Sequence, residues 1–230
     1  MNQNLSDVTV ILDRSGSMGL LQDPTISGYN EFKGEQAAAE GECIWTEVQF
    51  SSGPMASEVT VSPTPVGAVR NLSESNYYPS GMTALYDAIG NTIQSVHQRL
   101  LSMPEADRPA TVMIVITTDG YENSSREFSR NAIKNMITTQ QADHNWQFIF
   151  MGANQDAVLA AKDLGISKDS SLSYAGTDEG QKQAYKSISK SLSLSRKCAS
   201  RGIQRQAVFT ADDRAAQYAE GAVDNLRSDA

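Results

Sequence analysis

Oxygen-bearing side chains gather at three points of this sequence, each beside an apolar pattern. Asp13, Ser15 and Ser17 follow the apolar run 8–12, and Asp119 follows the most apolar run of the chain, 111–118. Thr83 stands at the start of the most regular helical pattern. Open α/β sheets bind ligands at the carboxyl ends of their strands. If the two apolar runs are neighbouring strands, Asp13 and Asp119 meet there, and Thr83 can reach the same crevice.

These side chains offer only hydroxyl and carboxylate oxygen. Such ligands, without sulfur or imidazole, suit a hard cation such as Mg²⁺, with Mn²⁺ as the alternative. Gly16 lets the first loop bend, so that residues 13, 15 and 17 can point to one side. Two carboxylates would neutralise a divalent ion and leave one position open to an outside anion. The sequence therefore predicts a metal site formed by Asp13, Ser15, Ser17, Thr83 and Asp119.

Apolar strands and amphipathic helices alternate along most of the chain. We expect strands at 8–12, 44–50, 58–62, 111–118, 146–151 and 171–174. We expect helices at 22–40, 83–101, 125–140, 155–164 and 178–196. A short turn joins the second and third strands, which makes that pair antiparallel. This order predicts an α/β fold with a mainly parallel six-stranded sheet and helices on both faces.

The end of the chain departs from this alternation. We expect one domain over residues 1–200 and a C-terminal extension over residues 201–230. Thr210 and Asp213 match a capping box, which predicts an alanine-rich helix over 212–223. The apolar face of that helix is thin, so we expect it to pack on the domain or on a partner.

Three spaced elements of the sequence resemble a known metal site. They are Asp-x-Ser-x-Ser, a threonine 66 residues after Ser17, and the aspartate of Thr-Asp-Gly 36 residues after that. In this order they resemble the metal-ion-dependent adhesion site (MIDAS) of von Willebrand factor type A (vWA) domains. The resemblance covers about residues 5–200, and segments 83–90, 118–123 and 150–156 resemble small stand-alone members from bacteria and their phages.

The resemblance carries expectations about fold and function. It implies a doubly wound, Rossmann-like sheet in the strand order 3-2-1-4-5-6, with one antiparallel edge strand. In that family, an aspartate, two serines, a threonine and a second aspartate hold Mg²⁺, and an acidic residue of a protein partner completes the coordination. The implied function is a Mg²⁺-dependent protein-binding module rather than an enzyme. The matching positions here are Asp13, Ser15, Ser17, Thr83 and Asp119.

Charge is distributed unevenly along the chain. The net charge of −8 disfavours non-specific binding to duplex DNA. Residues 181–211 nevertheless contain seven basic side chains and no acidic one. Lys182, Lys186 and Lys190 recur every four residues and predict a basic ridge on one helix. This ridge is either a solvated surface or a docking surface, and docking to an acidic protein or a nucleic acid is the alternative function.

Other classes of protein fit the sequence less well. A phosphatase of the haloacid dehalogenase type would need an aspartate where Ser15 stands, so a metal-dependent phosphohydrolase is disfavoured. The sequence contains no Walker-A loop, and neither His97 nor His144 lies near a candidate nucleophile in sequence. We find no pattern of a signal peptide or of a membrane span, and we therefore expect a cytoplasmic protein without membrane contact.

Overall fold

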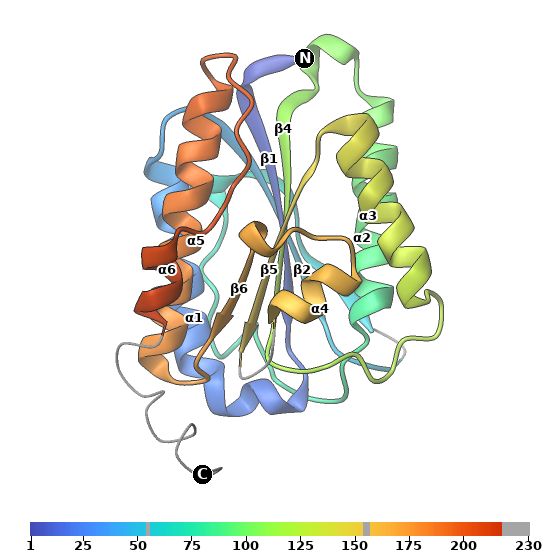
Figure 1. Cartoon of the computed structure of the whole chain (residues 1–230), viewed down its shortest axis with the longest axis vertical. Coiled ribbons are helices and arrows are strands. Elements are labelled where there is room, and N and C mark those ends of the chain that lie inside the picture. The colour runs from blue at the N-terminus through green and yellow to red at the C-terminus, as the bar shows by residue number, and fades with distance from the viewer. Residues whose placement is uncertain (54–55, 154–156, 218–230) are drawn as a thin grey trace.

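A six-stranded sheet forms the centre of the molecule, in the order β3-β2-β1-β4-β5-β6 (Figure 1). The computed structural model describes residues 1–53, 56–153 and 157–217. Neighbouring strands are parallel except β2 and β3, which pair antiparallel at one edge. The strands are β1 (Asn2–Asp13), β2 (Glu42–Phe50), β3 (Ser57–Pro65), β4 (Pro109–Thr118), β5 (Gln147–Ala153) and β6 (Ser171–Tyr174). The predicted fold class and strand order are confirmed.

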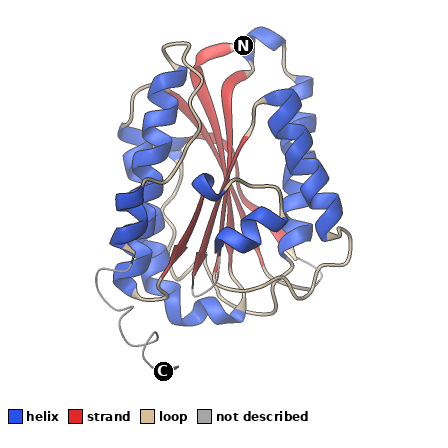
Figure 2. Cartoon of the chain, in the orientation of Figure 1, coloured by secondary structure: helices blue, strands red, loops and turns tan. Residues whose placement is uncertain are grey.

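Helices cover both faces of this sheet (Figure 2). One face carries α1 (Gln22–Ala38) and α5 (Asp178–Ala199), which pack against each other, and α6 (Ala211–Ala216) lies on α5. The other face carries α2 (Leu85–Ser102), α3 (Arg130–His144) and α4 (Ala157–Asp163). Short 3-10 helices occur at η1 (Gly16–Leu21), η2 (Val66–Ala68), η3 (Glu105–Asp107) and η4 (Lys168–Ser170).

Strand β1 is buried on both sides because each side meets a different core. Val8, Val10 and Leu12 belong to the core under α1 and α5, whereas Ile11 belongs to the core under α2 and α3. Strands of parallel sheets that are buried on both faces have nearly continuous apolar runs in their sequences. The loop that follows β1 therefore begins at the end of a strand that is buried on both faces.

Helix α3 begins five residues later than the sequence predicted. The expected helix over 125–140 assumed that Phe128 was helical, but the helix starts at Arg130 and runs to His144. The N–H groups of residues 126, 127 and 128 donate instead to the carboxylate of Asp87 in α2, at 2.8–3.0 Å. Ser129 then caps the helix by accepting from the Ala132 N–H over 3.3 Å. A long-range partner thus overrides the local helical pattern.

The C-terminal segment returns along α5 and β6. Ser195 Oγ donates to the Arg205 carbonyl over 2.6 Å, and the Ala207 N–H donates to Gln147 Oε1 over 2.7 Å. The capping box of Thr210 and Asp213 is present at the start of α6. Helix α6 ends at Ala216, and the rest of the helix expected over 212–223 lies outside the described residues from 218 onward.

The two edges of the sheet differ. Strand β3 runs through Pro63 and Pro65, which lie exposed beyond the predicted end of the strand at residue 62. Strand β6 has only four residues. Arg214 of the C-terminal segment donates to the carbonyl of Ser171, the first residue of the strand, and the Phe209 N–H donates to the Asp169 carbonyl just before the strand. Among the helices of the described residues, none is long and apolar enough to cross a membrane.

Candidate metal centre

Asp13 is the last residue of β1, and its side chain is buried beside the end of β4. Leu12 lies opposite Thr117 in the parallel pair of β1 and β4, so the two strands finish at the same level. Thr118 Oγ1 donates a hydrogen bond to Asp13 Oδ2 over 2.5 Å. The two central strands therefore place the Asp13 carboxylate at the carboxyl edge of the sheet, with one oxygen already oriented.

A chain of polar contacts joins the loop after β1 to the loop after β4. The Ser15 N–H donates to Asp13 Oδ1 over 2.7 Å. The hydroxyl oxygens of Ser15 and Ser17 lie 3.2 Å apart. Ser17 Oγ donates to Asp119 Oδ1 over 2.7 Å. The structure thus brings Asp13, Ser15, Ser17 and Asp119 into one continuous cluster.

Thr83 completes the set from the loop that precedes α2. A Cβ atom placed on Gly120 would lie 3.3 Å from Thr83 Oγ1 and 3.8 Å from Ser17 Oγ. Both hydroxyls therefore face the main chain of Gly120, the residue that follows Asp119. All the side chains predicted as metal ligands lie together at the carboxyl edge of the sheet, where the loops converge in Figure 1.

The segment before Thr83 holds the first loop in place. The Gly16 N–H donates to the Gly81 carbonyl over 2.9 Å. Gly81 has a φ of +78°, a conformation that favours glycine. Tyr77 is buried, and its hydroxyl donates to the Asp13 carbonyl over 2.6 Å. The main chain around Asp13 is thus fixed from the core side by Tyr77 and from the loop side by Gly81.

Main-chain N–H groups at the start of α2 and in the loop after β4 donate to side chains of the opposite segment. We call this set the α2 clasp, formed by Asp87, Glu122, Asn123 and Ser125. The Thr83 N–H donates to Asn123 Oδ1 over 2.8 Å, and the Asn123 N–H returns to the Thr83 carbonyl over 3.0 Å. The Tyr86 N–H donates to Glu122 Oε2 over 2.9 Å. The clasp satisfies N–H groups that a helix start leaves free, and it ties Thr83 to the loop of Asp119.

The two carboxylates of the cluster carry an electrostatic cost. Burial raises the pKa of Asp13 to about 6, although hydrogen bonds from Thr118 and Ser15 act in the opposite direction. Burial also raises the pKa of Asp119. Among the described residues, neither carboxylate forms an ion pair with a basic side chain. Asp13 is buried and Asp119 is half-buried, and neighbouring negative charges in such a setting are unfavourable without a basic partner. A cation bound between them would remove that cost.

The donor set fits a hard divalent cation. Among the described residues, no group of three or more His, Cys, Asp or Glu side chains is placed to hold a metal ion. Here two carboxylates combine with the hydroxyls of Ser15, Ser17 and Thr83, and oxygen ligands of this kind suit Mg²⁺ or Mn²⁺. Water molecules readily fill the remaining positions around Mg²⁺.

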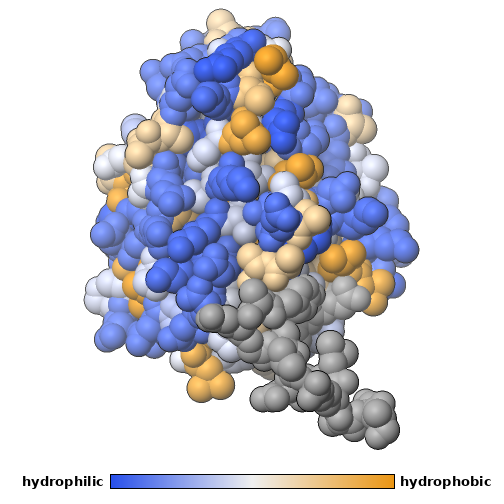
Figure 3. Space-filling view, turned by 60° about the vertical axis from the view of Figure 1, so that its left-hand side comes forward, coloured by the Kyte–Doolittle hydropathy of each residue, from blue (hydrophilic) through white to orange (hydrophobic). Residues whose placement is uncertain are grey.

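The predicted basic ridge lies on the outer side of α5. In sequence it comes more than 60 residues after Asp119, the last of the candidate metal ligands. Lys182, Lys186 and Lys190 are all exposed there. Lys190 Nζ lies 3.9 Å from Asp213 Oδ1 of α6, and Arg201 lies 3.7 Å from Glu40. Figure 3 shows this side of the molecule, on which hydrophilic surface predominates. Part of the basic charge is thus paired within the chain.

The sequence alone did not identify several residues that hold Asp13 and the loop after β4 in place. Thr118 looked like the last residue of an apolar strand, yet its hydroxyl orients Asp13. From sequence, Tyr77 is either part of an apolar rim or an ordinary residue of the loop before Thr83, and Asp87 lies inside a helical pattern. Their hydrogen-bond partners are 64 and about 40 residues away. The Thr-Asp-Gly sequence was the available signal for Thr118. For Tyr77 and Asp87 the sequence contains no local signal, because their partners are set by tertiary packing.

Comparisons with known proteins agree on the fold. No protein-family model and no curated protein sequence matches the chain. The pilus adhesin SpaC from Lactobacillus rhamnosus GG is similar in structure, with a TM-score of 0.60, 12% identity, and coverage of 82% of this chain and 30% of that one. Proximal thread matrix protein 1 from the mussel byssus gives a TM-score of 0.58 and 14% identity, covering 84% and 48%.

Two further solved structures are informative. A von Willebrand factor type A structure from Catenulispora acidiphila has a TM-score of 0.51 and 14% identity, and covers 83% of this chain and 42% of that one. A form of the mussel protein described as having a zinc-occupied MIDAS motif has a TM-score of 0.50 and 12% identity, with 82% and 46% covered. This chain spans less than half the length of each of these proteins.

Proposed function

We propose that this chain, which has the fold of von Willebrand factor type A domains, is a metal-dependent protein-binding module. Asp13, Ser15, Ser17, Thr83 and Asp119 hold a divalent cation, of which Mg²⁺ is the first choice and Mn²⁺ the second. A carboxylate from an Asp or Glu of a protein partner takes the open position. The module binds its partner and performs no catalysis.

One observation carries the proposal. The carboxylate at the end of β1, the carboxylate just after β4 and the hydroxyl of Ser17 lie in one cluster of contacts, while no described basic side chain forms an ion pair with Asp13 or Asp119. Such an arrangement is costly for the protein alone and favourable around a cation. The mussel neighbour with a zinc-occupied MIDAS motif shows that this fold accommodates a divalent metal in another protein.

Each protein group has a defined part in this function. A bound cation would supply the positive charge that holds the partner carboxylate. Thr118 and the Ser15 N–H fix both oxygens of Asp13, so that this side chain does not need to reorganise. The α2 clasp fixes Thr83 against the loop of Asp119. Binding therefore requires little ordering of the site, which favours affinity.

Equilibrium binding of the metal tests the first half of the proposal. Titration calorimetry with Mg²⁺ and with Mn²⁺ should show one site per chain. The variant Asp119→Asn should bind at least tenfold more weakly, which corresponds to about 1.4 kcal/mol. The matched control is Asp107→Asn, because Asp107 is an exposed acid just before β4, at the opposite end of that strand. An unaffected Asp119→Asn variant would overturn the site assignment.

Capture of a partner tests the second half. The wild-type chain, immobilised in the presence of Mg²⁺, should retain proteins that EDTA releases, and Asp119→Asn should not retain them. The Asp107→Asn variant should retain the same set as the wild type. Identical retention by wild type and Asp119→Asn would show that capture does not use the metal centre.

A further inference from the structure

An apolar pocket with a volume of about 230 Å³ lies beside the metal centre. It is lined by the start of α2, the loop after β4, the first residue of α3, strand β5 and helix α4. Leu85, Phe150 and Leu164 form its buried floor, and all three belong to the core under α2 and α3. Ala160 lines the pocket from α4 and is only partly buried. The pocket is thus an opening into the apolar core at the carboxyl edge of the sheet.

Gly120 is shared by the pocket and the metal centre. It lines the pocket, and a Cβ at this position would approach Thr83 Oγ1 to 3.3 Å. Leu85, on the pocket floor, follows Thr83 by two residues. A group held at the centre and a group held in the pocket are therefore separated by little more than the main chain of one loop. Both can belong to a single short stretch of a partner chain.

The polar groups around the pocket are already occupied. Arg130 Nη1 and Asp163 Oδ2 lie 2.9 Å apart at its mouth and neutralise each other. Glu122 accepts hydrogen bonds from the N–H groups of Tyr86 and Ser125, among others. The pocket thus offers apolar surface, because the charged groups of these lining residues already have hydrogen-bond or ion-pair partners. An apolar cavity of about 150 Å³ is large enough for benzene, so this one can hold an aromatic ring or a large aliphatic side chain.

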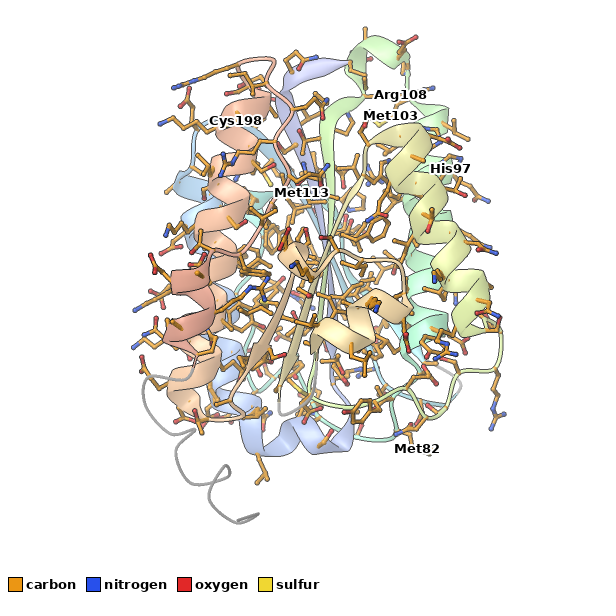
Figure 4. All side chains as sticks on the ribbon, viewed as in Figure 1. Met82, His97, Met103, Arg108, Met113 and Cys198 are labelled. Carbon is orange, nitrogen blue, oxygen red and sulfur yellow. The ribbon has the colours of Figure 1, made fainter. Side chains whose placement is uncertain are left out.

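The loops around the centre also expose apolar side chains. Leu20 comes from η1, and Met82 and Tyr121 come from two loops, with exposed fractions of 93%, 52% and 66%. Figure 4 labels Met82 at this edge, at the opposite end of the molecule from His97 and Arg108. Bulky apolar side chains exposed around a polar site are typical of interaction surfaces.

From this juxtaposition we infer that the pocket next to Gly120 is a specificity site, and that it takes an aromatic or large aliphatic side chain located close to the captured carboxylate in the partner. The inference rests on the proposed function, since the metal centre provides the first anchor. It narrows the partner to a segment in which Asp or Glu has a bulky apolar neighbour. An acidic segment rich in small or polar residues would leave the pocket unfilled and would bind more weakly.

A series of simple carboxylates tests this inference in the presence of Mg²⁺. The probes are acetate, phenylacetate, 3-phenylpropanoate and 4-phenylbutanoate, which carry the same ring at increasing distance from the same carboxylate. Dissociation constants come from NMR chemical-shift titration of the labelled full chain. We expect at least one aryl acid to bind at least tenfold more tightly than acetate, and we expect EDTA to abolish binding of the whole series.

Two variants and one control test whether the tighter binding of the aryl acids depends on the pocket. Ala160→Phe fills the pocket and should remove the advantage of the aryl acids while Mg²⁺ affinity is retained. Tyr121→Ser changes an exposed side chain on the pocket rim, should fold normally, and should weaken the aryl acids several-fold without affecting acetate. Lys162→Phe places the same ring at an exposed position of α4 outside the pocket and should behave as the wild type.

The outcomes separate this inference from the proposed function. If Mg²⁺ binds and acetate binds with it, but no aryl acid exceeds acetate, the specificity pocket is refuted and the metal-dependent capture stands. Aryl acids that retain their advantage in both Ala160→Phe and Tyr121→Ser also refute the pocket. If neither Mg²⁺ nor Mn²⁺ binds, both the inference and the proposed function fail.

Discussion

Ser17 and Asp119 are joined by a hydrogen bond of 2.7 Å although 102 residues separate them in the chain. The bond connects the loop after β1 to the loop after β4, and it exists because these strands are parallel neighbours that end at the same level. A cation at this position would compete for the same two oxygens. The metal-free protein therefore already holds the two loops at the spacing from which metal binding starts.

Mg²⁺ should raise the melting temperature of the protein. A ligand that binds only the folded state at 100 times its dissociation constant adds about 2.7 kcal/mol. For a chain of this size the corresponding rise is roughly 5–10 °C. Calorimetric melting with increasing Mg²⁺ measures it, with Asp119→Asn expected to lose the rise and Asp107→Asn to keep it. No rise with millimolar Mg²⁺ would contradict the assigned centre.

The effect of Mg²⁺ should depend on pH. Burial raises the pKa of Asp13 from 3.8 to about 6, so the stability gained from protonating this group is complete below 3.8 and is lost as the pH rises through about 6. Protons compete with the cation for the same carboxylate. The rise in melting temperature should therefore be larger at about pH 7.5 than at about pH 5. Equal rises at both pH values would show that Asp13 does not bind the metal as a carboxylate.

Thr118→Val should destabilise the protein at neutral pH. The Thr118 hydroxyl donates to the buried Asp13 carboxylate, and loss of a hydrogen bond to a charged group costs about 1.5–3 kcal/mol. The pKa of Asp13 should rise further, because this bond lowers it. Urea denaturation measures the free energy of unfolding. Thr118→Ser retains the hydroxyl and should lose distinctly less, and equal losses in both variants would assign the effect to packing.

The candidate ligands could be predicted from sequence, whereas their supports could not. Asp13, Ser15 and Ser17 form a local motif beside an apolar run, and Asp119 follows the run that becomes the neighbouring strand. Thr118 and Asp87 act on groups 105 and about 40 residues away, at positions where local patterns predict only strand or helix. Local periodicity also placed the start of α3 too early, because it contains no information on the carboxylate of Asp87.

Asp87→Ala should loosen the loop between β4 and α3. The carboxylate accepts N–H groups of residues 126, 127 and 128, and the substitution leaves them without their partner at a cost of about 2–4 kcal/mol. Hydrogen exchange of these amides should become faster. The control is Asp107→Ala, an exposed substitution expected to stay within about 0.5 kcal/mol. Unchanged exchange in Asp87→Ala would show that the α2 clasp does not hold this loop.

Gly90→Ala should destabilise the protein, although alanine favours helices. A Cβ at residue 90 of α2 would lie 2.7 Å from ring atoms of Phe128, and overpacking of this kind costs about 1–3 kcal/mol. The matched control is Gly34→Ala in α1, where no atom lies within 4 Å and a gain of about 0.5–1 kcal/mol is expected. Chemical denaturation compares the two variants, and a gain in both would mean that Phe128 moves freely.

The edges of the sheet have a consequence for self-association. An exposed edge strand can act as a template on which a second chain adds a strand and starts aggregation. Pro63 and Pro65 lack N–H groups and therefore interrupt the row of free main-chain donors along the edge of β3. The pairing of β2 with β3 is itself irregular near Glu47. The C-terminal segment bonds at the start of the short strand β6 on the other side. The molecule therefore resists growth by strand addition and presents its loops, not its strands, to other chains.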